Sequence, residues 1–352
     1  MKIKDIKIFP REIKKKKPFR IALGTRYFYE GVLVRVETEE GIYGWGEAAP
    51  SFSITGETMN TIVVVAEKLK EGFIGREVAI EALEDVRKSI LHHSAAKAAF
   101  DIALHDIIGK HARLPLKTFF GGSKEKIKTD MSIGIESIEE TEEDVRKYLE
   151  QGFKVIKLKI GLDRKEDEEK VRRIRESLGY GFELTLDANQ GYGVREAIKT
   201  MRGMERYEIE FVEQPIPAWD VSGLREVRRN ISIPLMADEA VHCTHDAFRV
   251  LSEEACDYIN VKLMKAGGLH EASKIVTLAE SCGVKCMMGC MTETRVGITA
   301  ATHLALGRRN IVYADLDGHV DLLGDPTLGG IEIEDGYCLL SDKIGLGCDV
   351  NL

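Results

Sequence analysis

The sequence predicts an α/β barrel that follows a small α+β domain. Two observations lead to this prediction. From about residue 127, apolar strand-like runs alternate with helical stretches, and acidic or basic residues end several of the runs. Runs that are apolar throughout are typical of parallel strands buried on both faces. Eight such units in one continuous stretch favour a barrel over an open sheet.

The first part of the chain has a different rhythm. Residues 1–9 and 31–48 have the pattern of strands, and the second run reads as a hairpin that turns at Glu40-Gly41. Strands followed by helices predict an α+β domain. The helical periodicity covers residues 57–72, 79–91 and 94–111.

In the second part, helices are expected between the strands, for example at residues 164–178, 193–206 and 268–282. The expected strands lie near residues 127–134, 154–160, 183–188, 209–213, 233–238, 257–262, 284–289 and 311–316. We therefore divide the chain into a capping domain (1–122), a barrel (123–318) and a C-terminal segment (319–352) that packs back on the capping domain.

Composition narrows the class of protein. No apolar run is long enough to span a membrane, and the N-terminus lacks the apolar stretch of a signal peptide. The formal net charge of −8 gives no reason to expect a nucleic-acid partner. The single basic run, Lys14 to Lys17, is expected to be a solvated loop. The seven cysteines are an odd number, which favours a reduced, cytoplasmic protein.

Three acids follow successive strands at equivalent points of the repeat. They are Asp187, Glu213 and Asp238. In a barrel, functional residues gather at the carboxyl ends of the strands. Carboxylate oxygens suit a hard cation, so we expect these acids to bind one Mg²⁺, with Mn²⁺ as a substitute. Any one of them could instead cap the following helix.

Lysines precede and follow these acids. Lys157 and Lys159 are two apart on one strand and should point to the same side, into the barrel. A second ammonium makes a lysine easier to deprotonate, so Lys157 is expected to help Lys159 act as a base. Lys262 lies four strands further on, and Asn260 faces the same side.

This arrangement suits proton transfer at carbon. A proton next to a carboxylate is very weakly acidic, and its removal creates a dianionic enediolate that a divalent cation can stabilise. One base on each face of that planar intermediate permits inversion at the carbon.

The ordered set of motifs resembles one enzyme family. KxK at 157–159, DxN at 187–189, EQP at 213–215, DE at 238–239 and NxK at 260–262 are similar to the muconate-lactonizing subgroup of the enolase superfamily. The resemblance covers the whole chain. It implies a (β/α)7β modified TIM barrel with an α+β N-terminal capping domain whose loops close over the site.

The resemblance also implies roles for these residues. Mg²⁺ would bind Asp187, Glu213 and Asp238, and Lys159 and Lys262 would form the acid/base pair. The lysine that matches Lys262 usually serves the S face, and the one that matches Lys159 serves the R face. Relatives are often homo-oligomers, but no interface can be read from this sequence.

Asp315 and Asp317 narrow the reaction. They are two apart after the last strand, so they should point the same way into the site. They resemble the DxD signature of dipeptide epimerases, which holds the free α-ammonium of the substrate by charge-assisted hydrogen bonds. Their alternative role is a further metal site or a helix cap. The match also implies that Ser132, Lys157, Cys290 and Thr292 touch the substrate.

The capping loops set the specificity in this resemblance. Ser53 to Glu57, including Thr55, is similar to one epimerase capping loop. Epimerases that prefer Ala-Glu often have an arginine in the other loop, where this chain has Gly24, flanked by Arg20 and Arg26. We therefore expect an isomerase that inverts the second residue of an L-Ala-L-Xaa dipeptide, with Xaa not restricted to Glu.

Two alternatives remain. The first is a lyase or cycloisomerase of the same subgroup, such as an o-succinylbenzoate synthase, whose substrate lacks the α-ammonium. The second is a non-catalytic, metal-binding relic, which the presence of all five central residues argues against. An assay with an N-blocked dipeptide separates the epimerase from the lyase.

Overall fold

The computed structural model describes residues 1–122 and 124–352, so residue 123, where the expected barrel domain starts, lies outside the described residues. The capping domain begins with a three-stranded antiparallel sheet in the order β1-β2-β3. Its strands are β1 (Ile3–Ile21), β2 (Gly24–Thr38) and β3 (Tyr43–Ala48). The turn at Glu40-Gly41 between β2 and β3 agrees with the sequence prediction.

The first hairpin is much longer than the sequence indicated. β1 and β2 remain paired as far as Ile21 and Gly24, beyond a register shift between Lys14 and Phe19. The basic run Lys14 to Lys17 therefore lies in β1, so the prediction of a loop is wrong, although Lys14, Lys16 and Lys17 are exposed as predicted. Lys15 is only 7% exposed. Its strand is covered by the segment that follows the last barrel strand, where Lys15 forms a bridge with Leu322.

Close packing of helix on sheet fixes the capping domain. A Cβ atom on Gly46 would lie 1.8 Å from the carbonyl oxygen of Ala99, and one on Gly44 would lie 2.1 Å from that of Ala103. The alanines on the helix and the glycines on β3 thus allow the two backbones to approach. The capping helices are α1 (Met59–Phe73), α2 (Ile80–Lys88), α3 (Ser94–Ala112) and the short α4 (Leu116–Phe119).

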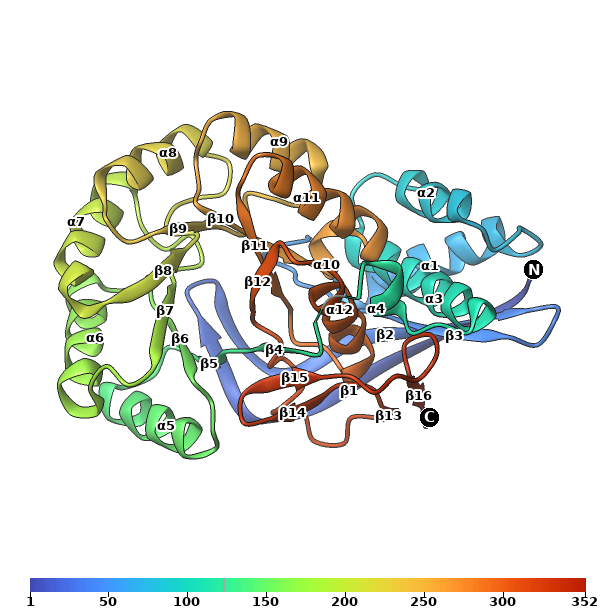
Figure 1. Ribbon diagram of the computed structural model, residues 1–352, viewed down its shortest axis with the longest axis horizontal. Helices are drawn as coiled ribbons and strands as arrows, with labels where there is room; N and C mark the ends of the chain where they lie inside the picture. The colour runs from blue at the N-terminus through green and yellow to red at the C-terminus, as the bar shows by residue number, and fades with distance from the viewer. Residues whose placement is uncertain (123) are drawn as a thin grey trace.

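The second part of the chain is a curled parallel sheet with helices around it (Figure 1). Its strands follow in sequence order from β5 to β12. A bridge between Thr129 and Ala314 joins the two ends of the sheet. The strands are β5 (Met131–Ile133), β6 (Val155–Lys159), β7 (Glu183–Asp187), β8 (Ile209–Glu213), β9 (Leu235–Ala237), β10 (Tyr258–Lys262), β11 (Lys285–Gly289) and β12 (Ile311–Ala314).

Helices alternate with these strands, as the sequence predicts. Short turns, α10 (Leu263–Ala266) and the 3-10 helix η1 (Glu205–Tyr207), accompany the longer helices. The longer ones are α5 (Ile138–Glu150), α6 (Arg164–Leu178), α7 (Val194–Met204), α8 (Val221–Asn230), α9 (Thr244–Ser252), α11 (Leu269–Ser281) and α12 (Arg295–Gly307). No helix in the described part of the chain is long and apolar enough to cross a membrane.

The C-terminal segment forms short strands that tie the two parts together. β13 (Thr327–Gly329) pairs with β16 (Cys348–Val350), and β14 (Glu332–Glu334) and β15 (Tyr337–Leu339) extend β4 (Lys126–Lys128). Asp349 accepts hydrogen bonds of 2.7 Å from Tyr43 and Trp45 of the capping sheet. The segment therefore contacts the capping domain, as expected, and also the strand that leads into the barrel.

A buried carboxylate also fastens the capping domain to the barrel. Glu47 of β3 is fully buried and accepts hydrogen bonds from the backbone N–H groups of Thr294 and Gly297 at 2.7 and 2.8 Å. These groups belong to the first turn of α12, whose N–H groups have no partner within the helix. Burial raises the pKa of Glu47 to about 7, although these hydrogen bonds lower it. The contact holds the capping sheet against the loop that follows β11.

Candidate active site

The predicted site residues gather at the carboxyl ends of the barrel strands. Lys157 and Lys159 lie on β6, and Asp187 and Glu213 end β7 and β8. The register pairs Lys159 with Asp187 and Asp187 with Glu213. Asp238 directly follows β9, and Lys262 ends β10. Parallel strands in this register bring their last side chains to one edge of the sheet.

The three acids are fully buried and share lysine partners. Asp187, Glu213 and Asp238 each have no exposed surface. The Lys157 Nζ lies 2.7 Å from Glu213 Oε2 and 3.3 Å from Asp187 Oδ2. The Lys262 Nζ lies 2.7 Å from Asp238 Oδ2 and 4.0 Å from Glu213 Oε1. Ammonium groups thus lie close to pairs of neighbouring carboxylates and balance their charge.

The pKa directions show how strongly these charges interact. Burial, together with Asp187 and Asp238, raises the pKa of Glu213 to about 7. For Asp238, burial would raise the pKa, but Lys262 and a further lysine, Lys265, lower it well below its usual value. The carboxylates in turn raise the pKa of Lys157 and Lys262 against the effect of burial. Acids and lysines therefore form one coupled unit.

The donor set of the three acids fits a hard divalent cation. In the described structure, Glu213 Oε2 and Asp238 Oδ1 accept no hydrogen bond of good geometry, although ammonium groups lie 2.7 and 2.5 Å away. The negative charges of the neighbouring carboxylates raise the pKa of Glu213. A cation among the three acids would offset this repulsion between them. The acids do not form as tight a group as Cys290, Asp315 and Asp317, which each bring a ligand atom within 4.8 Å of the others.

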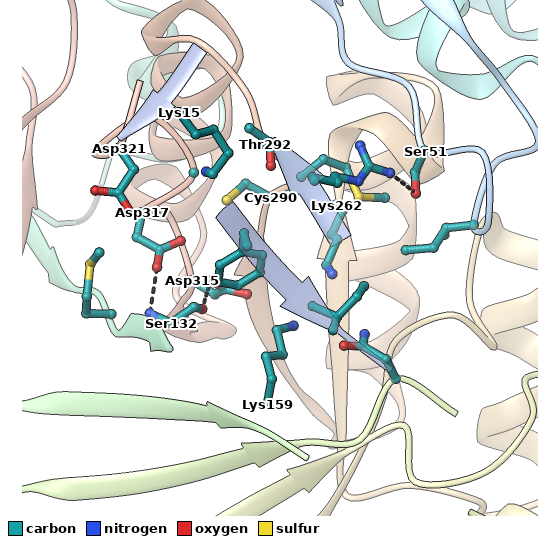
Figure 2. Close-up of a pocket in the computed structure, with 18 residues that line it drawn as sticks. Lys15, Ser51, Ser132, Lys159, Lys262, Cys290, Thr292, Asp315, Asp317 and Asp321 are labelled. Atoms are coloured by element: carbon teal, nitrogen blue, oxygen red, sulfur yellow. Dashed lines mark hydrogen bonds between the residues drawn. The ribbon is translucent and has the colours of Figure 1, made fainter. Parts of the chain in front are cut away.

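Asp315 and Asp317 point into the same cavity, as predicted (Figure 2). Asp315 Oδ2 lies 2.7 Å from Lys157 Nζ, and Asp317 Oδ2 accepts a 2.6 Å hydrogen bond from the backbone N–H of Ser132. Lys157 leads the charges that lower the pKa of Asp315 against the effect of burial, whereas burial and Asp315 raise the pKa of Asp317 to about 7. Asp315 already pairs with an ammonium group, which is the kind of ligand predicted for this pair.

The cavity is lined by most of the residues that the sequence singled out. Lys159 and Lys262 reach it from strands that lie four apart in the sheet order. Lys157 is fully buried and is not among the lining residues, so instead of the predicted contact with substrate it contacts the lining residue Asp315. The remaining predicted residues in the lining are Ser132, Cys290, Thr292, Asp315 and Asp317.

The two specificity residues are placed differently from the prediction. Gly24 lines a neighbouring groove on the capping domain, and Thr55 donates to the carbonyl of Ser51 within its turn. Arg26 lines the cavity in place of Gly24, and Ile54 lines it in place of Thr55. Gly24 pairs with Ile21 next to the hairpin turn, whereas Arg26 lies further along β2 opposite Phe19, which also lines the cavity.

Sequence reasoning missed several residues that complete the site. Lys265 is 2% exposed and lies 2.5 Å from Asp238 Oδ1, so it shares that acid with Lys262. Asp130 is buried beside Asp315 and Asp317, which together with burial raise its pKa. Asp130 stands directly before the first barrel strand, a position where a buried acid could have been suspected. Lys15 of the capping domain also lines the cavity, although the sequence pattern predicts that it is solvated.

Comparisons with known proteins decide the family. Residues 3–121 match the N-terminal domain of mandelate racemase / muconate lactonizing enzyme, and residues 140–352 match the enolase C-terminal domain-like family. The chain therefore belongs to the mandelate racemase / muconate lactonizing enzyme family of the enolase superfamily. The family membership agrees with the resemblance carried by the KxK, DxN, EQP, DE and NxK motifs.

Relatives within the family are dipeptide epimerases. An L-Ala-D/L-Glu epimerase from Clostridium acetobutylicum is 40% identical, and a hydrophobic dipeptide epimerase from Enterococcus faecalis is 39% identical; both alignments cover 99% of each chain. The substrate-liganded L-Ala-D/L-Glu epimerase from Bacillus subtilis superimposes with a TM-score of 0.98 at 40% identity over the whole of both chains. The Enterococcus faecalis enzyme with Mg and L-Leu-L-Tyr gives a TM-score of 0.96 at 38% identity, over 99% of this chain and 100% of that one.

Cation binding should be measurable without an activity assay. Mg²⁺ added to chelator-treated protein should raise the melting temperature, because a ligand at about 100 times its Kd stabilises the folded state by about 2.7 kcal/mol. Glu213→Gln should lose most of this shift. Glu210→Gln, which changes an acid on the same strand outside the cluster, should keep it. An equal shift in both variants would remove Glu213 from the cation site.

Proposed function

We propose that this protein is a Mg²⁺-dependent dipeptide epimerase that inverts the α-carbon of the second residue by a two-base proton transfer. The observation that carries the proposal is the pair of lysines, Lys159 and Lys262, which enter one cavity from distant strands beside the Asp315-Asp317 pair. Epimerase activity of the close relatives supports the reaction class.

Lys159 and Lys262 transfer the protons. One lysine takes the α-proton from one face, and the other returns a proton to the opposite face, so that the configuration inverts. When bound, Mg²⁺ supplies the positive charge that makes the carbon next to the substrate carboxylate acidic enough. The carboxylate partners, Asp187 for Lys159 and Asp238 for Lys262, hold the ammonium groups at 2.5 and 2.7 Å.

Asp315 and Asp317 would hold the free α-ammonium of the substrate. One carboxylate oxygen of Asp315 accepts a hydrogen bond from Lys157 Nζ, and one of Asp317 accepts a hydrogen bond from the backbone N–H of Ser132. The fixed orientation means that little freedom is lost when the substrate binds. A lyase substrate without this ammonium would bring no positive charge to the two neighbouring acids, which favours the epimerase over the o-succinylbenzoate synthase alternative.

The site also has a place for the second residue. Arg26 and Ile54 line the cavity, and Arg26 donates hydrogen bonds to the carbonyl of Pro50 and to Ser51 Oγ at 3.1 and 2.8 Å. Because its terminal nitrogens are engaged within the capping domain, we infer that Arg26 shapes this end rather than reading an acid. We also propose a cytoplasmic location, which the seven free cysteines suit.

The two-base scheme predicts the behaviour of lysine variants. Lys159→Ala and Lys262→Ala should each lower epimerisation by at least about 100-fold, because each direction needs one lysine as base and the other as acid. Each variant should still exchange the α-proton of one enantiomer in heavy water, at the face of its remaining lysine. The control is Lys154→Ala, which changes an exposed lysine just before β6, the strand that carries Lys159. Normal epimerisation by either active-site variant would exclude the scheme.

The ammonium clamp predicts a charge-dependent loss. Asp315→Asn and Asp317→Asn keep the size of the side chain but remove its charge, which should cost about 1.5–3 kcal/mol, or roughly 10- to 100-fold in kcat/KM. An N-acetylated dipeptide, which lacks the ammonium, should be a poor substrate for the wild type. Unchanged kinetics of both variants on free dipeptides would favour the lyase.

The capping loops predict a preference at the second residue. L-Ala-L-Leu or L-Ala-L-Phe should be turned over better than L-Ala-L-Glu, because Ile54 lines this end of the cavity and the terminal nitrogens of Arg26 are already engaged by Pro50 and Ser51. Gly24→Arg is a poor probe, since its φ of +137° strains any other residue. The measurement is a competition between these dipeptides in the wild type and in Arg26→Leu. A wild type that prefers L-Ala-L-Glu, and loses the preference in Arg26→Leu, would show that Arg26 reads the acid.

A further inference from the structure

The active-site cavity has two chemically different ends. Figure 2 shows Lys15 and Asp321 on the side of Asp317, while Ser51, which binds Arg26, lies on the opposite side. The substrate ammonium is assigned to Asp315 and Asp317 in the proposed function. The side chain of the first residue, which is attached next to that ammonium, therefore points towards Lys15 and Asp321. The second residue points towards Arg26.

Lys15 has an unusual environment for a lysine. It is 7% exposed, yet no carboxylate of the described residues lies within 4.0 Å of its Nζ, whereas its neighbour Lys17 pairs with Glu136 and Asp144. The nearest aromatic ring is that of Phe19, 5.6 Å from the Nζ. The ammonium faces the cavity, where an anionic ligand would interact with it more strongly than in bulk water. Lys15 lines the substrate cavity, so a ligand can supply the missing anion.

The backbone holds Lys15 in this place. Lys15 forms a bridge with Leu322, and the N–H of Lys16 donates a 2.8 Å hydrogen bond to the carbonyl of Asp321. The strand β1 is thereby attached to the segment that carries the ammonium clamp. Lys15 also contributes to the charges that lower the pKa of Asp317, against burial and Asp315, which raise it. The backbone of Lys15 is therefore held next to the segment of the clamp, and its ammonium is close enough to act on Asp317.

From this geometry we propose that Lys15 is a specificity residue for the first position of the dipeptide and selects an acidic side chain, L-Glu or L-Asp, over L-Ala. The inference rests on the proposed dipeptide epimerisation. The carboxylate of such a side chain would pair with Lys15 while its α-ammonium pairs with Asp315 and Asp317. A charge-assisted contact inside a closed cavity gives both affinity and direction.

A different role for Lys15 makes a different prediction. Lys15 could merely balance Asp317 and Asp321, whose negative charges exceed the one positive charge of a substrate ammonium. In that case its removal would affect all dipeptides alike, because all of them carry the ammonium. If Lys15 reads the substrate, only dipeptides with an acidic first residue depend on it.

The test compares kcat/KM for L-Glu-L-Leu, L-Gln-L-Leu and L-Ala-L-Leu in the wild type, Lys15→Met and Lys16→Met. Lys16 is the matched control, since it is exposed and donates to the carbonyl of Val320. The wild type should prefer L-Glu-L-Leu. Lys15→Met should lose roughly 10- to 100-fold on this substrate and change little on L-Ala-L-Leu. Lys16→Met should resemble the wild type.

The outcomes separate the inference from the proposed function. Equal losses on all dipeptides in Lys15→Met, or a wild type that prefers L-Ala-L-Leu to L-Glu-L-Leu, would overturn the role of Lys15 and leave the epimerase intact. Failure of the wild type to epimerise any of these dipeptides would overturn the proposed function itself. The melting temperature of each variant shows whether a loss comes from misfolding.

Discussion

The buried ion network around Lys157 is the interaction on which the site depends. This one ammonium lies within 3.3 Å of Asp187, Glu213 and Asp315, and so links two of the three candidate cation ligands with the ammonium clamp. Removing one partner of a buried ion pair leaves an uncompensated charge and is strongly destabilising. The chain can keep so many acids at the centre of the barrel only because lysines from β6 and β10 lie among them. Geometry at one part of the cavity is thus coupled to charge at the others.

That coupling also explains how Lys262, whose pKa is raised in the structure, can act as a base. In the structure, Asp238 leads the groups that raise the pKa of Lys262 against burial, and Glu213 follows it. A base must lose its proton within the working pH range, and these acids hold it on. Both acids belong to the predicted cation site, so positive charge on them would weaken their pull on Lys262. Cation binding and the availability of the base are therefore linked through the same two carboxylates.

The sequence was most informative where acidic or basic residues recur at the same point of the strand-helix repeat. The acids of β7, β8 and β9 could be assigned because each follows an apolar run at the same point of a repeat, and the pairing of Lys159, Asp187 and Glu213 agrees with that assignment. Predictions failed where the burial of a residue depends on a segment that is distant in the sequence, because the local pattern carries no information about that segment. Lys15 stands in a run of four lysines, which reads as solvated. It is buried because a segment more than 300 residues later covers it, and no local pattern encodes that contact.

The same reasoning leads us to propose that the capping domain, rather than the barrel, determines which dipeptide fits. In the proposed function, the barrel residues bind groups that every dipeptide has, namely a carboxylate, an α-proton and an α-ammonium. In that proposal the side chains of the substrate face β1, β2 and the loop after β3, which supply Lys15, Arg26 and Ile54 respectively. Buried carboxylates such as Glu47 hold these elements in place without touching the reacting atoms. Relatives with about 40% identity can therefore share a catalytic core while acting on Ala-Glu or on hydrophobic dipeptides.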